Sequence, residues 1–423
     1  MQPPINQDDE DRLSSLAVIL PLAVAGFMLA AGCWALFSVA GVYIRQSLEL
    51  NSVTFGFLLA LPMATGAILA IPAGLAAQKF GSRRVMVTCL AGLAACMALL
   101  IVADSLAEFL AAGAGLGLAG GYYSAGLQFV TRYAPGRRTG LVLGLFGAGI
   151  TGVGISYYLV PLILDAFTWS VVPLAYLILL SLVLMLVLLL TDPEDAEAGA
   201  ASETSVRALL ARLRRVRVWQ VAVWFGVVAG SFFGLALWLP DYLASQYQLP
   251  VQTGAGLAQW FIIPGAGAQI LGGWLSDRFG STRVANRSLM ACLLGLFVLS
   301  YPPMTLLIQG IDQTIRLEFL MPLPLEGALI VVLGVALGCT MAALQRTMVK
   351  ENREATAFVA GLLLVSACSV AFLLPVVFAA VNHWVGVRSA VFMILFLLLA
   401  ATLTLLARDA RRQERQTLLH PGI

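Results

Sequence analysis

The chain has 423 residues, of which 60% are hydrophobic and 11% are charged, and its formal net charge is only +3. Soluble globular domains carry roughly 25% charged residues, so this composition excludes a cytosolic globular enzyme and a disordered protein. A mean hydropathy of +0.92 indicates that the chain is solvated by a lipid bilayer. The small net charge gives no sign of a nucleic-acid partner.

Twelve long apolar segments follow one another along the chain, with few or no charges inside them. They cover 16–44, 52–78, 85–103, 107–131, 140–164, 169–191, 218–246, 251–276, 287–308, 326–345, 355–381 and 386–407. Each is long enough to cross a hydrocarbon core of about 30 Å as a helix, which satisfies its own backbone hydrogen bonds in lipid. We therefore expect an all-α polytopic membrane protein with twelve transmembrane helices.

One long polar break, from Thr191 to Arg217, separates the first six segments from the last six. We expect a tail at 1–15, a six-helix bundle at 16–191, a linker at 192–217, a second bundle at 218–408 and a tail at 409–423. The linker opens with an acidic stretch and closes with several arginines, which is typical of a tether with a basic helix at the membrane surface. The Pro-rich loop 301–326 lies either over the mouth of the bundles or in the membrane interface.

Basic residues are concentrated on one side of this predicted topology. Of the 25 lysines and arginines, 22 fall in the tails, the linker and the loops on the same side, and the other side holds only Arg45, Arg316 and Arg388. Because short cytoplasmic loops are enriched in Lys and Arg, we expect both termini to lie in the cytoplasm and the chain to reside in a bacterial-type inner membrane.

A loop motif occurs once in each half, at Gly74–Arg84 and at Gly273–Arg283, with an offset of 199 residues. The second copy reads G-x-L-x-D-R-x-G-x-x-R. A glycine allows close helix approach, and an acidic side chain at a helix end can pair with Arg or cap a neighbouring helix. We expect a gating contact between the bundles that involves these residues: Gly273, Asp277, Arg278, Gly280 and Arg283, with Gly74, Gly81 and Arg84 in the first copy, where Gln78 replaces the acid.

The span count, the repeated halves and the two loop motifs together make the chain resemble the major facilitator superfamily. The resemblance covers essentially the whole chain. It implies two six-helix bundles related by a parallel pseudo-two-fold axis, a substrate cavity between them, and alternating access by rocking of the bundles.

A finer resemblance is to the nitrate/nitrite porters. The Gly-rich fifth span at 140–154, the end of the seventh span at 238–243 and the stretch 372–375 are similar to that family. Those porters hold their anion with one Arg in span two and one in span eight, and the matching positions here are Ala70 and Gln269. The resemblance therefore implies a porter-like scaffold with an altered site.

No Asp, Glu, Lys, Arg or His is expected deep inside a span, which disfavours proton coupling through a buried carboxylate and a hard metal substrate. Neutral donors, acceptors and aromatic rings remain as candidates for the cavity. The candidate substrate-binding residues are Gln269, Tyr122, Tyr123, Gln128, Tyr157, Tyr158, Trp34, Phe232, Gln259 and Gln345, with Tyr43, Phe233 and Trp238 as weaker candidates. Gln269 stands out as an amide inside an apolar helix at the position of the porters' Arg.

These observations favour transport of a small solute by a chain that acts as a monomer. Two versions remain open: a porter-like carrier of a small anion, and an exporter of a larger amphipathic compound. A non-transporting sensor or assembly subunit is the alternative from another class. No P-loop, HExxH, catalytic-triad or EF-hand pattern occurs in the sequence, so we expect no enzymatic activity, no cofactor and no resident metal.

Overall fold

A computed structural model describes residues 7–191, 206–301, 304–309, 314–319, 321–385 and 389–419. The first half of the chain is helical throughout. Its elements are α1 (Gln7–Val39), α2 (Gly41–Ser47), α3 (Ser52–Phe80), α4 (Ser82–Ile101), α5 (Leu106–Leu116), α6 (Leu118–Tyr133), α7 (Thr139–Gly147), the 3₁₀ turn η1 (Ala148–Ile150), α8 (Thr151–Ala166) and α9 (Val171–Leu190).

The second half repeats this organisation, with a two-stranded antiparallel hairpin inserted into it. Its elements are α11 (Val206–Ala211), η2 (Arg212–Arg214), α12 (Val216–Gln246), α13 (Val251–Phe279), α14 (Ser281–Leu299), β1 (Met304–Gln309), β2 (Thr314–Phe319), α15 (Leu323–Glu351), η3 (Arg353–Ala355), α16 (Thr356–Val385) and α17 (Ala390–Leu419).

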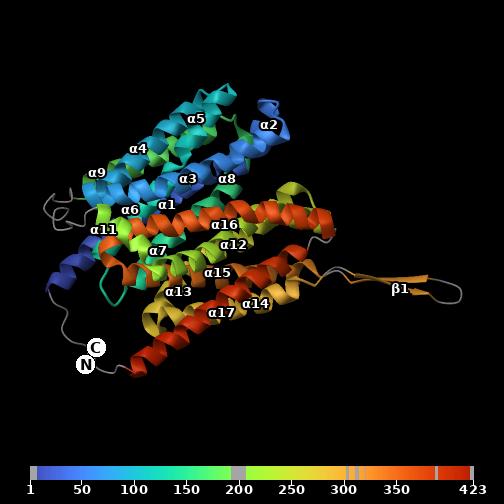
Figure 1. The fold of residues 1–423 in the computed structure, drawn as a ribbon. Helices are drawn as coiled ribbons and strands as arrows, with labels where there is room; N and C mark the ends of the chain where they lie inside the picture. Colours follow the sequence, from blue (N-terminus) through green and yellow to red (C-terminus); the bar gives the residue numbers. More distant parts are fainter. Residues whose placement is uncertain are drawn as a thin grey trace.

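The helices form two bundles, each with its own apolar core. One buried cluster joins α1 to α9 and includes a few residues of α13, α15 and α16 where the bundles meet, and the other joins α12 to α17. Figure 1 shows the first bundle, in blue to green, above the second, in yellow to red. The bundles meet where α3 packs on α16 and where α7 packs on α13. We call the end of the molecule with α11 and the α3–α4 and α13–α14 turns the linker end, and the opposite end, with β1 and β2, the hairpin end.

Ten helices in the described part of the chain are long and apolar enough to cross a membrane. The two further predicted spans correspond to α13 and to α5 with α6, which continue each other through Gly117, whose backbone remains helical (φ −60°, ψ −16°). The predicted segment 287–308 was too long, because α14 ends at Leu299 and Met304 already belongs to β1.

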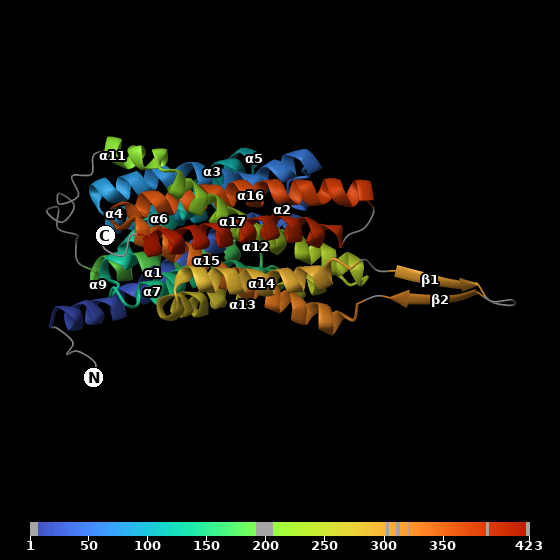
Figure 2. The same ribbon diagram turned by 60° about the horizontal axis from the view of Figure 1, so that its bottom comes forward.

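The loop between α14 and α15 contains the hairpin, in which Met304 pairs with Phe319 and Gln309 with Thr314. Figures 1 and 2 show that both strands project beyond the helix ends. The position of loop 301–326 over the mouth of the bundles or in the membrane interface stays a prediction. Polar and apolar residues alternate in β2, and β1 departs from this alternation only at Leu307, which favours a ribbon over a helix.

Candidate functional site

At the linker end, Asp277 joins the two bundles. Its carboxylate accepts hydrogen bonds from the backbone N–H groups of Gly140 (2.9 Å) and Leu141 (2.8 Å), which belong to the first turn of α7 in the other bundle. Arg346 of α15 donates to the same carboxylate at 2.7 Å. The side chains of Asp277 and Arg346 are only 10% and 15% exposed. Asp277 therefore caps α7 with a negative charge that Arg346 holds in place.

The first copy of the loop motif makes a neutral version of this contact. Gln78 lies 199 positions before Asp277 and faces the start of α16, where its amide oxygen can accept from Thr356 N–H at 3.3 Å while its nitrogen donates to the Glu354 carbonyl at 3.2 Å. Gln128 of α6 accepts from the neighbouring Ala357 N–H at 3.2 Å. Gln78 therefore docks a helix end on the opposite bundle without the charge that Asp277 brings to the equivalent contact.

Close backbone approach completes the closure of the linker end. A Cβ added at Gly144 would lie 2.2 Å from the carbonyl oxygen of Gln269, and one at Gly361 would lie 2.6 Å from that of Ala70. Ala70 and Gln269 are themselves related by the 199-residue offset. No side chain fits at either glycine, because real Cβ atoms do not approach other heavy atoms within 3.0 Å. Thus α7 crosses α13, and α16 crosses α3, at equivalent positions of α13 and α3.

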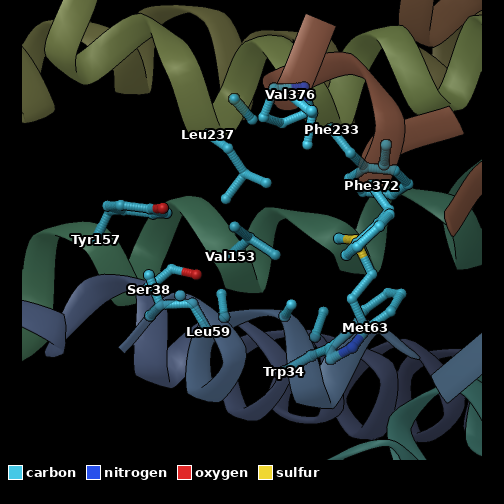
Figure 3. Close-up of a pocket in the computed structure, with 17 residues that line it drawn as sticks. Trp34, Ser38, Leu59, Met63, Val153, Tyr157, Phe233, Leu237, Phe372 and Val376 are labelled. Carbon is cyan, nitrogen blue, oxygen red and sulfur yellow. The ribbon is translucent and has the colours of Figure 1, made fainter. Parts of the chain in front are cut away.

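Towards the hairpin end, the bundles separate around a cavity of about 440 Å³. Residues of α1, α3 and α8 form one wall and residues of α12 and α16 form the other (Figure 3). The lining is mostly aliphatic and aromatic, and its side-chain polar groups are the hydroxyls of Ser38 and Tyr157 and the indole N–H of Trp34. None of the lining side chains is charged, so the cavity offers neutral hydrogen bonds and apolar contact.

Trp34 and Phe233 form the inner boundary of this cavity. Their ring centroids are 6.3 Å apart in an edge-on arrangement, and both side chains also line a smaller pocket of about 20 Å³ beyond them, together with Tyr123 and Gln269. The two aromatic residues are separated by 199 positions, so they are equivalent in the two halves. The pair lies between the outer cavity and the closed linker end.

A family model described as Major Facilitator Superfamily matches residues 22–375. The chain belongs to the Major Facilitator Superfamily. Accordingly it has the twelve-helix transporter fold in two six-helix halves, and it is an integral membrane transporter of a small-molecule substrate.

Among curated proteins, this superfamily member is similar to the probable nitrate/nitrite antiporter NarK1 of Thermus thermophilus, with 29% identity over 94% of this chain and 91% of the relative. It is 27% identical to a nitrite extrusion protein of Bacillus subtilis, over 66% and 69% of the two chains. Among solved structures it resembles the transporter FucP in the outward conformation (TM-score 0.72, 18% identity, 93% and 99% covered) and the proton:xylose symporter XylE (TM-score 0.74, 12% identity, 94% and 96% covered).

The structure of this transporter brings some of the predicted binding residues to the space between the bundles. Trp34 and Tyr157 line the outer cavity, and Tyr123 and Gln269 line the inner pocket. Gln269 also donates to the Gly147 carbonyl of the other bundle at 3.1 Å. Gln345 and Gln259, which are 1% and 8% exposed, lie against this region: their amide oxygens approach Gly147 and Gly154, respectively.

Four further predicted binding residues line neither the cavity nor the inner pocket and lie elsewhere. Gln128 lies at the linker end, where it caps α16. Tyr122 is fully buried in the first bundle and donates to the Ala23 carbonyl at 3.1 Å. Tyr158 is 62% exposed on the outside of α8. Phe232 stacks on Phe261 inside the second bundle, with ring centroids 4.9 Å apart. In each case the position of the residue around its helix, rather than the residue type, decides which way the side chain points.

Of the three weaker candidates, one lines the cavity and two pack inside a bundle. Phe233 lines the cavity, whereas Tyr43 stacks on Trp169 at 5.7 Å and Trp238 stacks on Tyr242 at 4.8 Å, each within its own bundle.

The predicted gating residues all lie at the linker end. Gly81 and Gly280 have φ of 91° and 89°, which an L side chain rarely adopts, and they make the tight turns that follow α3 and α13. Added Cβ atoms at Gly74 and Gly273 would lie 2.5 Å from Ala357 O and 2.1 Å from Gly140 O. The remaining three, Arg84, Arg278 and Arg283, are exposed. Arg278 lies over the rings of Trp274 and Phe279.

Sequence reasoning missed a buried acid at the hairpin end. Glu326 in the first turn of α15 is 3% exposed and hydrogen-bonds with the Tyr247 hydroxyl, which also donates to the Met321 carbonyl at 2.8 Å. Burial, with the neighbouring Glu326 carboxyl second, raises the pKa of the Tyr247 phenol. Glu326 stood at the edge of a predicted loop, so nothing in the local sequence signalled its burial.

Proposed function

We propose that this transporter moves a small amphipathic solute without a net charge, one with an apolar body and one or two hydrogen-bonding groups. The observation that supports it best is the 440 Å³ cavity, whose lining contains hydroxyl, indole and apolar groups and no charged side chain. Burying an ion in such a lining costs much more than burying a neutral solute, because no opposite charge compensates the lost hydration.

The proposed orientation places the linker end in the cytoplasm. The bias of 22 basic residues to that side supports it. In this orientation the structure is an outward-facing state, with the cavity towards the outside and Asp277 and Gln78 closing the cytoplasmic side. Alternating access requires these contacts to break while the hairpin end closes. We propose that one chain carries out transport as a monomer, since both walls of the cavity belong to it.

A second candidate is transport of nitrate or nitrite, the substrates named for the relatives from Thermus thermophilus and Bacillus subtilis. Two buried donors favour it. Trp34 Nε1 and Gln345 Nε2 have no hydrogen-bond partner among the described residues, and neutral N–H groups can hold an oxyanion. The resemblance to the nitrate/nitrite porters matches Ala70 and Gln269 to the two arginines of those porters, and side chains without charge at these positions support the uncharged solute instead.

A matched ligand pair separates the two candidates. Benzamide and benzoate have nearly the same shape and differ in charge, so thermal unfolding of the purified transporter is measured with each, and with nitrate and nitrite. A ligand at 100 times its Kd stabilises the folded state by about 2.7 kcal/mol. We expect stabilisation by benzamide and not by benzoate. A larger shift with nitrate or nitrite than with benzamide would overturn the proposal in favour of the second candidate.

A substitution in the cavity wall tests whether the solute binds in this cavity. Phe233→Ala removes one ring of the inner boundary and is expected to weaken solute stabilisation about tenfold, in line with about 1.4 kcal/mol of lost aromatic contact. Phe297→Ala is the control, because Phe297 is 67% exposed on the outside of α14. An equal weakening of solute stabilisation in the two variants would show that the solute does not bind in this cavity.

A further inference from the structure

A second large cleft lies at the linker end of the second bundle, outside the transport pathway. It has a volume of about 860 Å³, roughly twice that of the transport cavity. The start of α12, the first turns of α14, the end of α15 and the last part of α17 surround it. All of these elements belong to one bundle, so the cleft persists whatever the position of the other bundle.

The cleft is lined by four basic side chains and one acidic side chain: Arg217, Arg283, Arg346, Lys350 and Glu351. Arg217 is neutralised by Glu351 (2.9 Å) and by Asp409 (2.6 Å). Arg346 pairs with the carboxylate of Asp277, which also accepts hydrogen bonds from two backbone N–H groups of α7. Arg283 and Lys350 are exposed and form no ion pair with any described residue. Positive charge in the cleft is therefore left without a partner.

The backbone adds donors to the same place. Helix α14 starts at Ser281 without a side-chain cap, and its first intrahelical hydrogen bond runs from Val284 N to Gly280 O. The N–H groups of Ser281, Thr282 and Arg283 precede that bond, so they have no acceptor within the helix. All three residues line the cleft. The positive end of the α14 dipole therefore reinforces the charge of the side chains.

We propose that this cleft binds a phosphate group, carried either by an anionic lipid headgroup or by a free phosphate anion. Arg283 and Lys350 supply the uncompensated charge, Arg346 a further guanidinium, and the α14 backbone the directed N–H groups. Arg recognises phosphate oxygens through its planar fork and Lys acts as a point charge. Basic pockets between helices on one side of a membrane are suited to acidic headgroups. The proposal does not depend on which solute the transport cavity accepts.

The first bundle provides a matched comparison. Lys79 in the last turn of α3 and Arg84 in the first turn of α4 are exposed basic residues on either side of the pseudo-equivalent turn. The neighbouring Arg83 is engaged there by Thr191 (2.7 Å) and the Leu188 carbonyl (3.1 Å). Beside that turn the amide of Gln128 caps α16, whereas in the second bundle Arg346 pairs with Asp277. Removing Lys79 and Arg84 therefore changes the net charge by as much as removing Arg283 and Lys350, without touching the cleft.

The experiment uses the full-length protein in three states: in phosphatidylcholine nanodiscs, in the same nanodiscs with added inorganic pyrophosphate, and in nanodiscs containing phosphatidylglycerol. Binding is measured by titration from the rise in the unfolding midpoint. The double variant R283Q/K350Q is compared with K79Q/R84Q. Each Lys or Arg near an anionic membrane contributes about 1 kcal/mol, so the cleft variant is expected to bind roughly thirtyfold more weakly, while the control stays within a few-fold of the unmodified chain.

The outcomes distinguish the source of the phosphate. Stabilisation by pyrophosphate that R283Q/K350Q abolishes assigns the cleft to a free anion, and stabilisation by phosphatidylglycerol alone assigns it to a lipid. Stabilisation by neither, or an equal loss in both double variants, overturns the proposal. Unfolding midpoints in phosphatidylcholine without added anion show that both variants fold, and native mass spectrometry of the cleft variant provides an independent count of retained phosphatidylglycerol.

Discussion

Replacing Asp277 by Asn should open the linker end. In the present state both carboxylate oxygens accept N–H groups of α7, at 2.9 and 2.8 Å. An Asn side chain has one oxygen, so one of the two N–H groups would face an NH₂ group, and the negative charge at the helix end would be lost. The Arg346 contact lies within the second bundle and survives separation of the bundles, so it does not count towards closure.

The magnitude follows from these contacts. Losing one charge-assisted hydrogen bond and the favourable interaction with the α7 dipole costs about 2 to 3 kcal/mol, because the side chains at this site are mostly buried. The ratio of closed to open linker ends should fall by about 30- to 150-fold. A closed state populated at about 99% would then coexist with comparable amounts of the open state. Solute binding itself should persist, and turnover should slow.

The assay is pulsed electron–electron distance measurement between spin labels at Arg137 and Arg412, which are exposed near the linker end of the two bundles. Cys96 is replaced first, because it is half-buried while the other five thiols are buried. Asp409→Asn is the control: it breaks the 2.6 Å pair with Arg217 within one bundle. A distance distribution that Asp277→Asn leaves unchanged, or that Asp409→Asn broadens equally, would refute the reasoning.

Three further changes test other contacts. Gly144→Ala should abolish transport with normal membrane insertion, because its Cβ would lie 2.2 Å from the Gln269 carbonyl oxygen and keep α7 and α13 apart; Gly267→Ala, where nothing lies within 4 Å, should transport normally. Gln269→Ala removes one hydrogen bond to the other bundle. It should shift the equilibrium between closed and open linker ends, read from the same spin-label distances, by about 1 kcal/mol, which is less than the shift for Asp277→Asn. Tyr247→Phe leaves the buried Glu326 without its partner and should lower the free energy of unfolding by about 2 kcal/mol, measured by denaturant titration.

Each of these has an outcome that counts against it. Transport by Gly144→Ala at the level of Gly267→Ala would mean that the bundles need not approach as closely as described. A larger shift of the equilibrium between closed and open linker ends with Gln269→Ala than with Asp277→Asn would mean that the Gln269 amide, and not the Asp277 carboxylate, makes the main closing contact. An unchanged stability of Tyr247→Phe would show that Glu326 finds another partner or solvent.

The sequence alone determined the membrane fold and its symmetry. An apolar segment of about 20 residues has one way to satisfy its backbone in lipid, so its helical state follows from composition. The 199-residue offset between Gly74 and Gly273 predicted two related halves, and the family match confirms the fold. Asp277 was placed at a gating contact from its position at a helix end. The backbone N–H donors of α7 lie 136 and 137 positions away from Asp277, and its partner Arg346 lies 69 positions away, so no local pattern connects them.

The tertiary structure alone decided which side chains reach the cavity. In three adjacent aromatic pairs, one member faces the space between the bundles, namely Tyr123, Tyr157 and Phe233. Its neighbour, Tyr122, Tyr158 or Phe232, points into a bundle core or outwards. Adjacent residues on a helix are about 100° apart around its axis. In a span that is apolar on every face, hydrophobicity does not mark which direction is inward, so the rotation of each helix is set by long-range packing against helices from distant parts of the chain.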